Sequence, residues 1–352
     1  MESGAENRTL IGLNAVIISV AEDSPRVLSV RRARHALASP QQMGEAGLWA
    51  DTPDGLPFGP FDTDNHRTLE LGLHSWVQEQ TGLSLDYAEQ LYTFGDRGRD
   101  PRELTGGARL VSISYVALVG AAAPSGSGDA EWVGWYDFFP WEDWRKGRPA
   151  IIDELILPRL ASWAAADSPS EREFRQNRID TTFGTADAGW DFVRVLERYE
   201  LLYEAELVPE SIRDRQARAA ARGELDSATP SIADEDAVAA ARLLGRPLTQ
   251  DHRRILATAM GRLRGKLTYR PVVFDLLPDR FTLLQLQKVV EALSGVQLHK
   301  QNFRRMVQNA KLVEPTGQHD HAQRGRPAEL YRFRHEVVAE RQTPGMGRPS
   351  YR

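Results

Sequence analysis

Amide and guanidinium side chains are concentrated in one short stretch, residues 299–309. Phe303, Met306 and Val307 recur at helical spacing, so the remaining side chains lie on the exposed face of a predicted helix. That face carries Lys300, Gln301, Asn302, Arg304 and Arg305. Glutamine, asparagine and arginine match the edges of base pairs, and the major groove of DNA admits one α-helix. The stretch therefore predicts a DNA-reading helix.

The elements around this helix predict a winged helix. Thr282 and Gln285 form a capping-box pattern, which begins a helix upstream, and Gly295 ends it. Downstream, short strands are predicted at residues 312–314 and 330–334. Helix, turn, helix and a two-stranded wing is a known arrangement for placing a helix in the major groove.

The predicted wing has a polar tip at residues 318–323, followed by Arg-Gly-Arg-Pro. Arg324 and Arg326 in that sequence suit a narrow minor groove, whose negative potential attracts arginine. Three alternatives stay open at this point. The winged helix could contact protein, it could contact RNA, or its basic helix could simply be solvated.

Charge is distributed unevenly along the chain. The net charge is −5, yet residues 248–352 hold 19 basic and 9 acidic residues, against 25 and 40 in residues 1–247. Such segregation is expected when one domain meets a polyanion and the other does not. Two unrelated surfaces with accidental charges are the alternative.

The N-terminal part predicts a mixture of strands and helices. Strands are expected at residues 11–20, 27–31 and 110–119, and a helix at 68–80 ended by Gly82. An aromatic cluster between residues 132 and 144 is typical of a core or an interface.

The rest of the chain is mainly helical. Residues 151–210 have helical periodicity, 213–237 predict an exposed helix and a linker, and 251–267 predict a basic helix. We therefore expect an α+β protein in three parts: a ligand-binding domain (1–150), a helical segment with linker (151–247) and a winged-helix DNA-binding domain (248–352).

The stretch from residue 10 to 119 resembles Nudix domains, which have the pattern Gly-x5-Glu-x7-Arg-Glu-U-x-Glu-Glu-x-Gly-U, where U is apolar. Val77, Glu79, Gly82 and Leu83 match the end of this pattern. The first glycine, the first glutamate, the arginine and two further glutamates are replaced by Phe61, Arg67, Ser75, Trp76 and Gln80. The resemblance implies a Nudix-like α/β/α sandwich.

The departures concern the metal-binding residues of Nudix domains. Their glutamates hold divalent cations against a pyrophosphate, and hard cations need several carboxylate oxygens. Glu79 beside Trp76 and Gln80 provides too few, and Glu70 lies out of register. We therefore expect no efficient hydrolysis, no catalytic residue and no metal site.

A ligand-binding loop resembles its counterpart in ADP-ribose-type Nudix proteins. Residues 92–102 contain Thr-Phe-Gly-Asp and Arg-Asp-Pro-Arg. Guanidinium groups that follow a predicted strand could also bind phosphates. The expected effector-binding residues are Phe94, Asp96 and Arg102 from the loop, with Arg32 and Arg34 from the strand end. Core packing of Phe94 and a solvated strand end for the arginines are the alternatives.

A Nudix-like domain followed by a winged helix resembles the Nudix-related transcriptional regulators of NAD metabolism (NrtR- and NadQ-like). The segments 281–287, 299–305 and 324–328 carry the resemblance, which covers residues 10–119 and 251–334 but not 151–247. It implies a homodimer on a palindromic double-stranded DNA operator. The implied effector is NAD, ADP-ribose or ATP, and no cofactor is required.

Bulk properties agree with such a regulator. The chain has no cysteine, no signal-peptide pattern and no apolar run of membrane-spanning length, so we expect a cytoplasmic protein. The rival from another class is an active Nudix pyrophosphatase that acts on ADP-ribose or a related nucleotide. A third reading is a scaffold with a protein-binding winged helix.

Overall fold

The computed structural model describes most of the chain. The described residues are 9–31, 54–86, 88–100, 103–104, 106–120, 122–126, 129–166, 168–187, 189–223, 232–267, 272–320 and 327–334. No helix in these ranges is long and apolar enough to cross a membrane.

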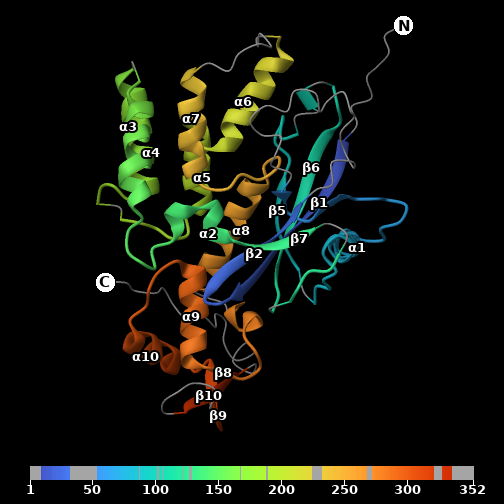
Figure 1. Cartoon of the computed structure of the whole chain (residues 1–352), viewed down its shortest axis with the longest axis vertical. Helices are drawn as coiled ribbons and strands as arrows, with labels where there is room; N and C mark the ends of the chain where they lie inside the picture. Colours follow the sequence, from blue (N-terminus) through green and yellow to red (C-terminus); the bar gives the residue numbers. More distant parts are fainter. Residues whose placement is uncertain are drawn as a thin grey trace.

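A mixed sheet forms the N-terminal half (Figure 1). Its main path runs β3-β2-β1-β6-β5, with β4 also paired to β1 and β7 paired to β2. β1 and β6 are parallel and the other pairs are antiparallel. The strands are β1 (Thr9–Ala21), β2 (Ser24–Arg31), β3 (Asp54–Gly55), β4 (Phe58–Pro60), β5 (Glu89–Phe94), β6 (Arg109–Leu118) and β7 (Ala130–Gly134).

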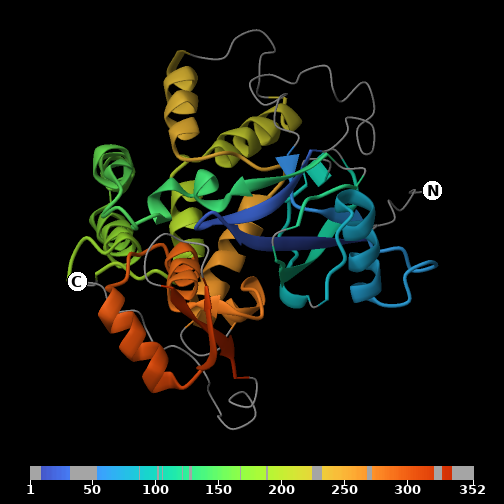
Figure 2. The same ribbon diagram turned by 60° about the horizontal axis from the view of Figure 1, so that its bottom comes forward.

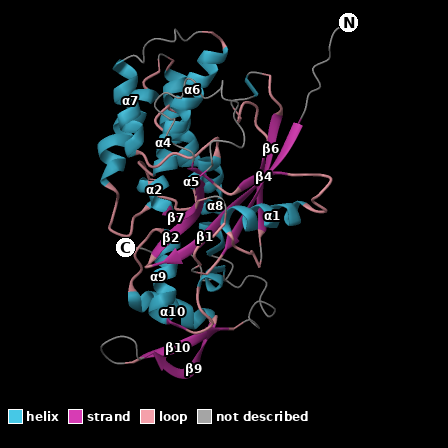
Figure 3. Cartoon of the chain, turned by 45° about the vertical axis from the view of Figure 1, so that its right-hand side comes forward, coloured by secondary structure: helices cyan, strands magenta, loops and turns pink. Residues whose placement is uncertain are grey.

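Both faces of this sheet are buried. Leu13, Ala15 and Ile17 of β1 point to the core beneath α1 (Leu69–Thr81), as alternation along a strand requires. Val16 and Ile18 point to the opposite face, into a core shared with the later helices. In Figure 3 α1 lies on one side of the sheet and the helical part of the chain on the other.

Helix α1 begins and ends where the sequence predicts. The Thr68 hydroxyl accepts a hydrogen bond from the Leu71 amide (3.1 Å), which satisfies a free N–H of the first turn. Gly82 follows with φ 71°, the left-handed conformation that glycine adopts most readily at a helix end.

The second helical layer of the sandwich is α8 (His252–Leu267). Its side chains share one apolar core with the sheet and with the middle helices. The predicted boundary at residue 247 groups α8 with the winged helix, and α8 packs both on the sheet and on α9. Periodicity identifies an apolar face but not the partner that covers it.

The middle of the chain is helical, as predicted. The aromatic segment enters the core, with Trp135, Phe138, Phe139 and Trp141 fully buried. The region predicted as an exposed helix and linker, 213–237, overlaps most of α6 and the first half of α7, and residues 224–231 of it lie outside the described ranges. The elements are α2 (Trp135–Phe138), η2 (Pro140–Glu142), η3 (Ile152–Ile156), α3 (Leu157–Ala164), α4 (Pro169–Phe183), α5 (Val195–Glu204), α6 (Pro209–Ala221) and α7 (Ile232–Leu243).

A compact C-terminal unit completes the fold. It contains η4 (Val272–Leu276), β8 (Phe281–Thr282), α9 (Leu283–Ser294), α10 (Lys300–Ala310), β9 (Val313–Asp320) and β10 (Ala328–Phe333). Its sheet has the order β8-β10-β9. Figures 1 and 2 place α10 and the two long strands at the end of the molecule farthest from α6 and α7. The predicted winged helix and the α+β class are confirmed.

Candidate nucleic-acid interface and effector loop

Helix α10 has one buried and one exposed face. Phe303 and Val307 are buried, and Met306 is half-buried against the same core. The polar residues predicted to read DNA are all exposed: Lys300, Gln301, Asn302, Arg304 and Arg305. A helix with a continuous amide and guanidinium face at the molecular surface can enter a major groove.

Helix α9 positions α10 through local contacts. The Gln285 backbone N–H donates to the Thr282 hydroxyl (3.2 Å), and the Thr282 backbone N–H donates to the side-chain oxygen of Gln285 (2.8 Å). The capping box is therefore complete. Gly295 ends α9 with φ 78°. The next helix then begins after His299, only a few residues later.

The wing is longer than predicted. β9 continues to Asp320, so residues 318–320 of the predicted polar tip belong to the strand. The sequence did not indicate this, because polar residues occur both in turns and on solvent-exposed strands. Arg324 and Arg326 lie outside the described residues. Arg280, which the sequence analysis did not single out, donates to the Gln318 side chain (2.5 Å) and adds an exposed cation beside β9 of the wing.

The basic surplus of the C-terminal part is smaller at the surface than in the sequence. All five cations of α8, among the 19 counted after residue 247, pair with carboxylates from earlier in the chain. These five therefore balance the acidic N-terminal half instead of facing DNA. The pairs are Arg253–Glu210, Arg254–Asp96, Arg262–Glu89, Arg264–Glu142 and Lys266–Glu89.

Two of the predicted effector residues are described. Phe94 is 2% exposed and packs in the core, with the guanidinium groups of Arg99 and Arg254 over its ring at 5.6 and 5.7 Å. The Asp96 side chain is exposed, and its hydrogen bond from Arg254 (2.5 Å) lowers its pKa. Arg32, Arg34 and Arg102 lie outside the described residues.

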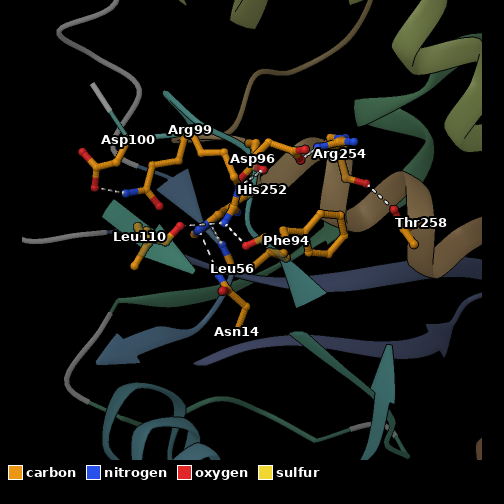
Figure 4. Close-up of polar contacts among 12 residues, drawn as sticks. Asn14, Leu56, Phe94, Asp96, Arg99, Asp100, Leu110, His252, Arg254 and Thr258 are labelled. Carbon is orange, nitrogen blue, oxygen red and sulfur yellow. Dashed lines mark hydrogen bonds and ion pairs between the residues drawn. The ribbon is translucent and has the colours of Figure 1, made fainter. Parts of the chain in front are cut away.

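The loop that carries these residues is fixed to the start of α8 (Figure 4). Arg99 donates two hydrogen bonds to the Asp251 carboxylate (2.6 and 2.5 Å) and a third to the Phe94 carbonyl (2.6 Å). The Gln250 side chain donates to Asp100 (3.1 Å). Sequence reasoning missed these contacts, because the partners lie about 150 positions apart and no local pattern links them.

A buried histidine of α8 also joins this helix to the sheet. His252 is fully buried, its Nδ1 accepts a hydrogen bond from the Leu56 amide (3.0 Å), and its Nε2 lies 3.0 Å from the Asn14 side-chain amide. The ring therefore bonds to β1 and to the start of the β3–β4 turn at once. Phe94–Asp100 contains two of the predicted effector residues, and we call it the effector loop after that prediction. It is held by α8 on one side and by the sheet on the other.

Two positions that the sequence analysis compared with the Nudix pattern have structural roles. Trp76 donates from Nε1 to the Pro60 carbonyl (2.9 Å), and the Gln80 amide bonds to both the N–H and the C=O of Phe58 (3.1 and 2.7 Å). These side chains attach α1 to β4. Within the described ranges, no group of three or more His, Asp or Glu side chains is arranged to hold a metal ion.

The fold and these two surfaces define the class: a Nudix-like domain joined to a winged helix whose α10 has an exposed polar, cationic face. Residues 273–333 match the family model described as the NrtR DNA-binding winged helix domain. The chain is 41% identical over 86 residues to the ADPR responsive transcriptional repressor NtrR of Acinetobacter baylyi. That alignment covers 24% of this chain and 34% of the repressor, so the chain spans about a third of this relative's length.

Solved structures extend the likeness to the whole fold. Shewanella oneidensis NrtR, complexed with a 27mer DNA, is 21% identical and has a TM-score of 0.50 over 94% of this chain and 95% of that one. A second structure, described as Shewanella oneidensis NrtR, gives the same identity and TM-score, with 96% of its chain covered. The resemblance to Nudix-related transcriptional regulators is therefore confirmed, by sequence in the winged helix and by fold elsewhere.

Proposed function

We propose that this protein is a transcriptional repressor of NAD-biosynthesis genes that binds DNA through α10 and the wing and responds to an NAD-related nucleotide. The observation that carries the proposal is the exposed row of amide and guanidinium groups on α10, within a domain that matches a DNA-binding family. The protein acts as a homodimer on a palindromic operator, in the cytoplasm with the DNA. Two winged helices at fixed spacing match two half-sites.

Charge reversal on the recognition helix tests the DNA-binding part. An arginine that reads a base contributes roughly 1–3 kcal/mol, so Arg304→Glu should weaken operator binding about 5–150-fold or more. Arg172→Glu on the exposed surface of α4 is the matched control, because it changes the net charge equally at a site remote from α10. Affinity is measured on the protein's own upstream DNA and on NAD-biosynthesis promoters at one fixed salt concentration. Equal losses in both variants would contradict the recognition-helix assignment.

The effector proposal concerns the loop Phe94–Asp100. The similar protein from Acinetobacter baylyi is described as ADPR responsive, which favours ADP-ribose over NAD and ATP as the first ligand to test. The Asp96 carboxylate is exposed and can accept hydrogen bonds from ribose hydroxyls or an adenine amine. Calorimetric titration of the full chain with the three nucleotides identifies the ligand. Repeating the DNA-binding assay with each nucleotide gives the direction of the response.

The Nudix-like domain is proposed to bind nucleotide without hydrolysing it. Trp76 and Gln80 stand where Nudix enzymes have glutamates, and both are used to attach α1 to β4. The single carboxylate of Glu79 provides too few oxygen ligands for a divalent cation. Magnesium-dependent release of AMP from ADP-ribose is the assay. Turnover that disappears in Glu79→Gln would establish the rival function, a pyrophosphatase.

A further inference from the structure

Helix α8 joins the effector loop to the winged helix. It has 16 residues, so its ends are about 24 Å apart. Twelve of its residues are buried, and each of its five cations is paired with a carboxylate of another element. A helix anchored by this many buried side chains and ion pairs moves as one body, since close-packed cores do not deform continuously.

The N-terminal end of α8 is attached to the effector loop by a bidentate ion pair. Arg99 and Asp251 are 5% and 16% exposed, and two parallel hydrogen bonds join them. Arg99 also donates to the Phe94 carbonyl, so the pair is fixed to the loop backbone. A second link, Arg254 to Asp96, is more exposed. Displacement of the loop therefore displaces Asp251 or breaks a nearly buried charge pair.

The C-terminal end of α8 is attached to α9. Arg264 donates from Nε to the Leu293 carbonyl in the last turn of α9 (3.1 Å). The same guanidinium binds the buried Glu142 carboxylate (2.5 Å). Two residues close to Glu142 in the sequence also form hydrogen bonds with the C-terminal end of α9. The Tyr136 hydroxyl donates to the Ala292 carbonyl (2.7 Å), and the Trp144 amide donates to the Gly295 carbonyl (2.7 Å). Since α9 precedes the recognition helix, a shift of α8 changes the position of α10.

We propose that α8 transmits effector binding to the winged helix, and that Arg99 and Asp251 are the positioning residues that couple the loop to it. This inference rests on the proposed function and specifies its regulation. A ligand shifts DNA affinity only through its differential affinity for two arrangements of the protein. The Arg99–Asp251 pair transfers that difference from the loop to α8.

A competing route exists at the turn between β1 and β2. Asp23 pairs with Lys288 of α9, and its carbonyl accepts a hydrogen bond from Arg145 (2.8 Å). The two side chains of the ion pair are 53% and 41% exposed. Exposed pairs contribute little and are screened by salt, so this contact orients the winged helix without transmitting the signal.

Asp251→Asn tests the route, with Asp23→Asn as the matched control. Each change removes one carboxylate charge from a contact outside the DNA-reading face and keeps the side-chain shape. Asparagine also remains suitable next to the first turn of a helix. For wild type and both variants, the operator Kd is measured with and without saturating ADP-ribose. The ADP-ribose Kd is also measured with and without operator DNA, because coupling is reciprocal.

The wild type is expected to show a ratio of operator Kd values in the usual allosteric range, about 5–150-fold. In Asp251→Asn both ratios should fall to within about twofold of 1, while each ligand alone still binds. Asp23→Asn should keep the wild-type ratios. Unchanged ratios in Asp251→Asn, or equal losses in both variants, would overturn the proposal.

Arg99→Lys provides a second variant if Asp251→Asn does not fold. Lysine keeps the charge but cannot form the two parallel hydrogen bonds, so the coupling ratio should fall in the same direction. Wild-type protein that binds no operator, or binds it equally with and without each nucleotide, refutes the proposed function instead. The two failures are thus distinguished by the wild-type measurement.

Discussion

The carboxylate of Glu142 should dominate the stability of the junction between the three parts of the chain. It is fully buried, and it binds Arg198 (2.5 Å) from α5 and Arg264 (2.5 Å) from α8. Both guanidinium groups are themselves almost completely buried. We consider Glu142→Gln, which keeps the size and one acceptor oxygen but removes the only charge of opposite sign among these three groups.

The expected loss follows from what the substitution leaves behind. Removing one partner of a buried ion pair costs about 3–5 kcal/mol, because the remaining charge stays out of water without compensation. Here two buried arginines lose their shared counter-ion. The retained amide oxygen still accepts one hydrogen bond, which offsets about 1 kcal/mol. We therefore expect the free energy of unfolding to fall by about 3 kcal/mol or more.

Urea unfolding of the full chain at pH 7, followed by tryptophan fluorescence, measures this loss. Trp141 and Trp144 flank Glu142 in the sequence and belong to the same core, so the signal includes this junction. Glu131→Gln is the control, since Glu131 is 47% exposed in its pair with Arg246 and should change stability by at most about 1 kcal/mol. A loss below 1 kcal/mol in Glu142→Gln would refute the reasoning.

Two further predictions concern the same region. Burial alone would raise the pKa of Glu142, but Arg198 and Arg264 outweigh it and hold that pKa below its ordinary value of 4.5. A depressed carboxylate pKa stabilises the fold above pH 4.5 and loses that contribution as the pH falls below it, so the difference between wild type and Glu142→Gln should stay constant from pH 7 to about pH 5 and shrink between about pH 5 and pH 3. A difference that stays constant from about pH 5 to pH 3 would be inconsistent with a charged Glu142. In α8, Gly261→Ala should destabilise by about 1–3 kcal/mol, because a Cβ there would lie 2.7 Å from the Val193 carbonyl oxygen. Gly265→Ala, where the nearest atom is 3.9 Å away, should be neutral or stabilising; thermal unfolding of the pair decides, and equal effects would contradict the close approach.

Features that depend on neighbours in sequence were predictable. Thr68, Gly82, Thr282 and Gly295 mark helix ends through contacts within a few residues, and the structure places all four where the sequence indicates. The exposed face of α10 follows from periodicity alone for the same reason. Helix caps and helical periodicity both depend on residues a few positions apart, so both can be recognised in the sequence.

Features that depend on distant partners were not predictable. Arg253 and Arg264 of α8 have the sequence character of solvated cations, yet both are buried because Glu210 and Glu142 neutralise them. Their partners lie 43 and 122 positions away. For the same reason the charge count overstated the basic surface of the C-terminal part, and the link between Arg99 and Asp251 left no signal.

The position of α8 in the sandwich has a consequence for biosynthesis. The sheet is completed by β7, which ends at Gly134, but the helix that covers one of its faces ends at Leu267, about 130 residues later. At ribosomal rates of roughly 5–20 residues per second, that interval lasts about 7–27 s. Throughout it the apolar side chains of one sheet face have no α8 to bury them. We therefore expect the nascent chain to bind chaperones that recognise exposed apolar strands, and we expect slower translation between β7 and α8 to increase its aggregation in cells.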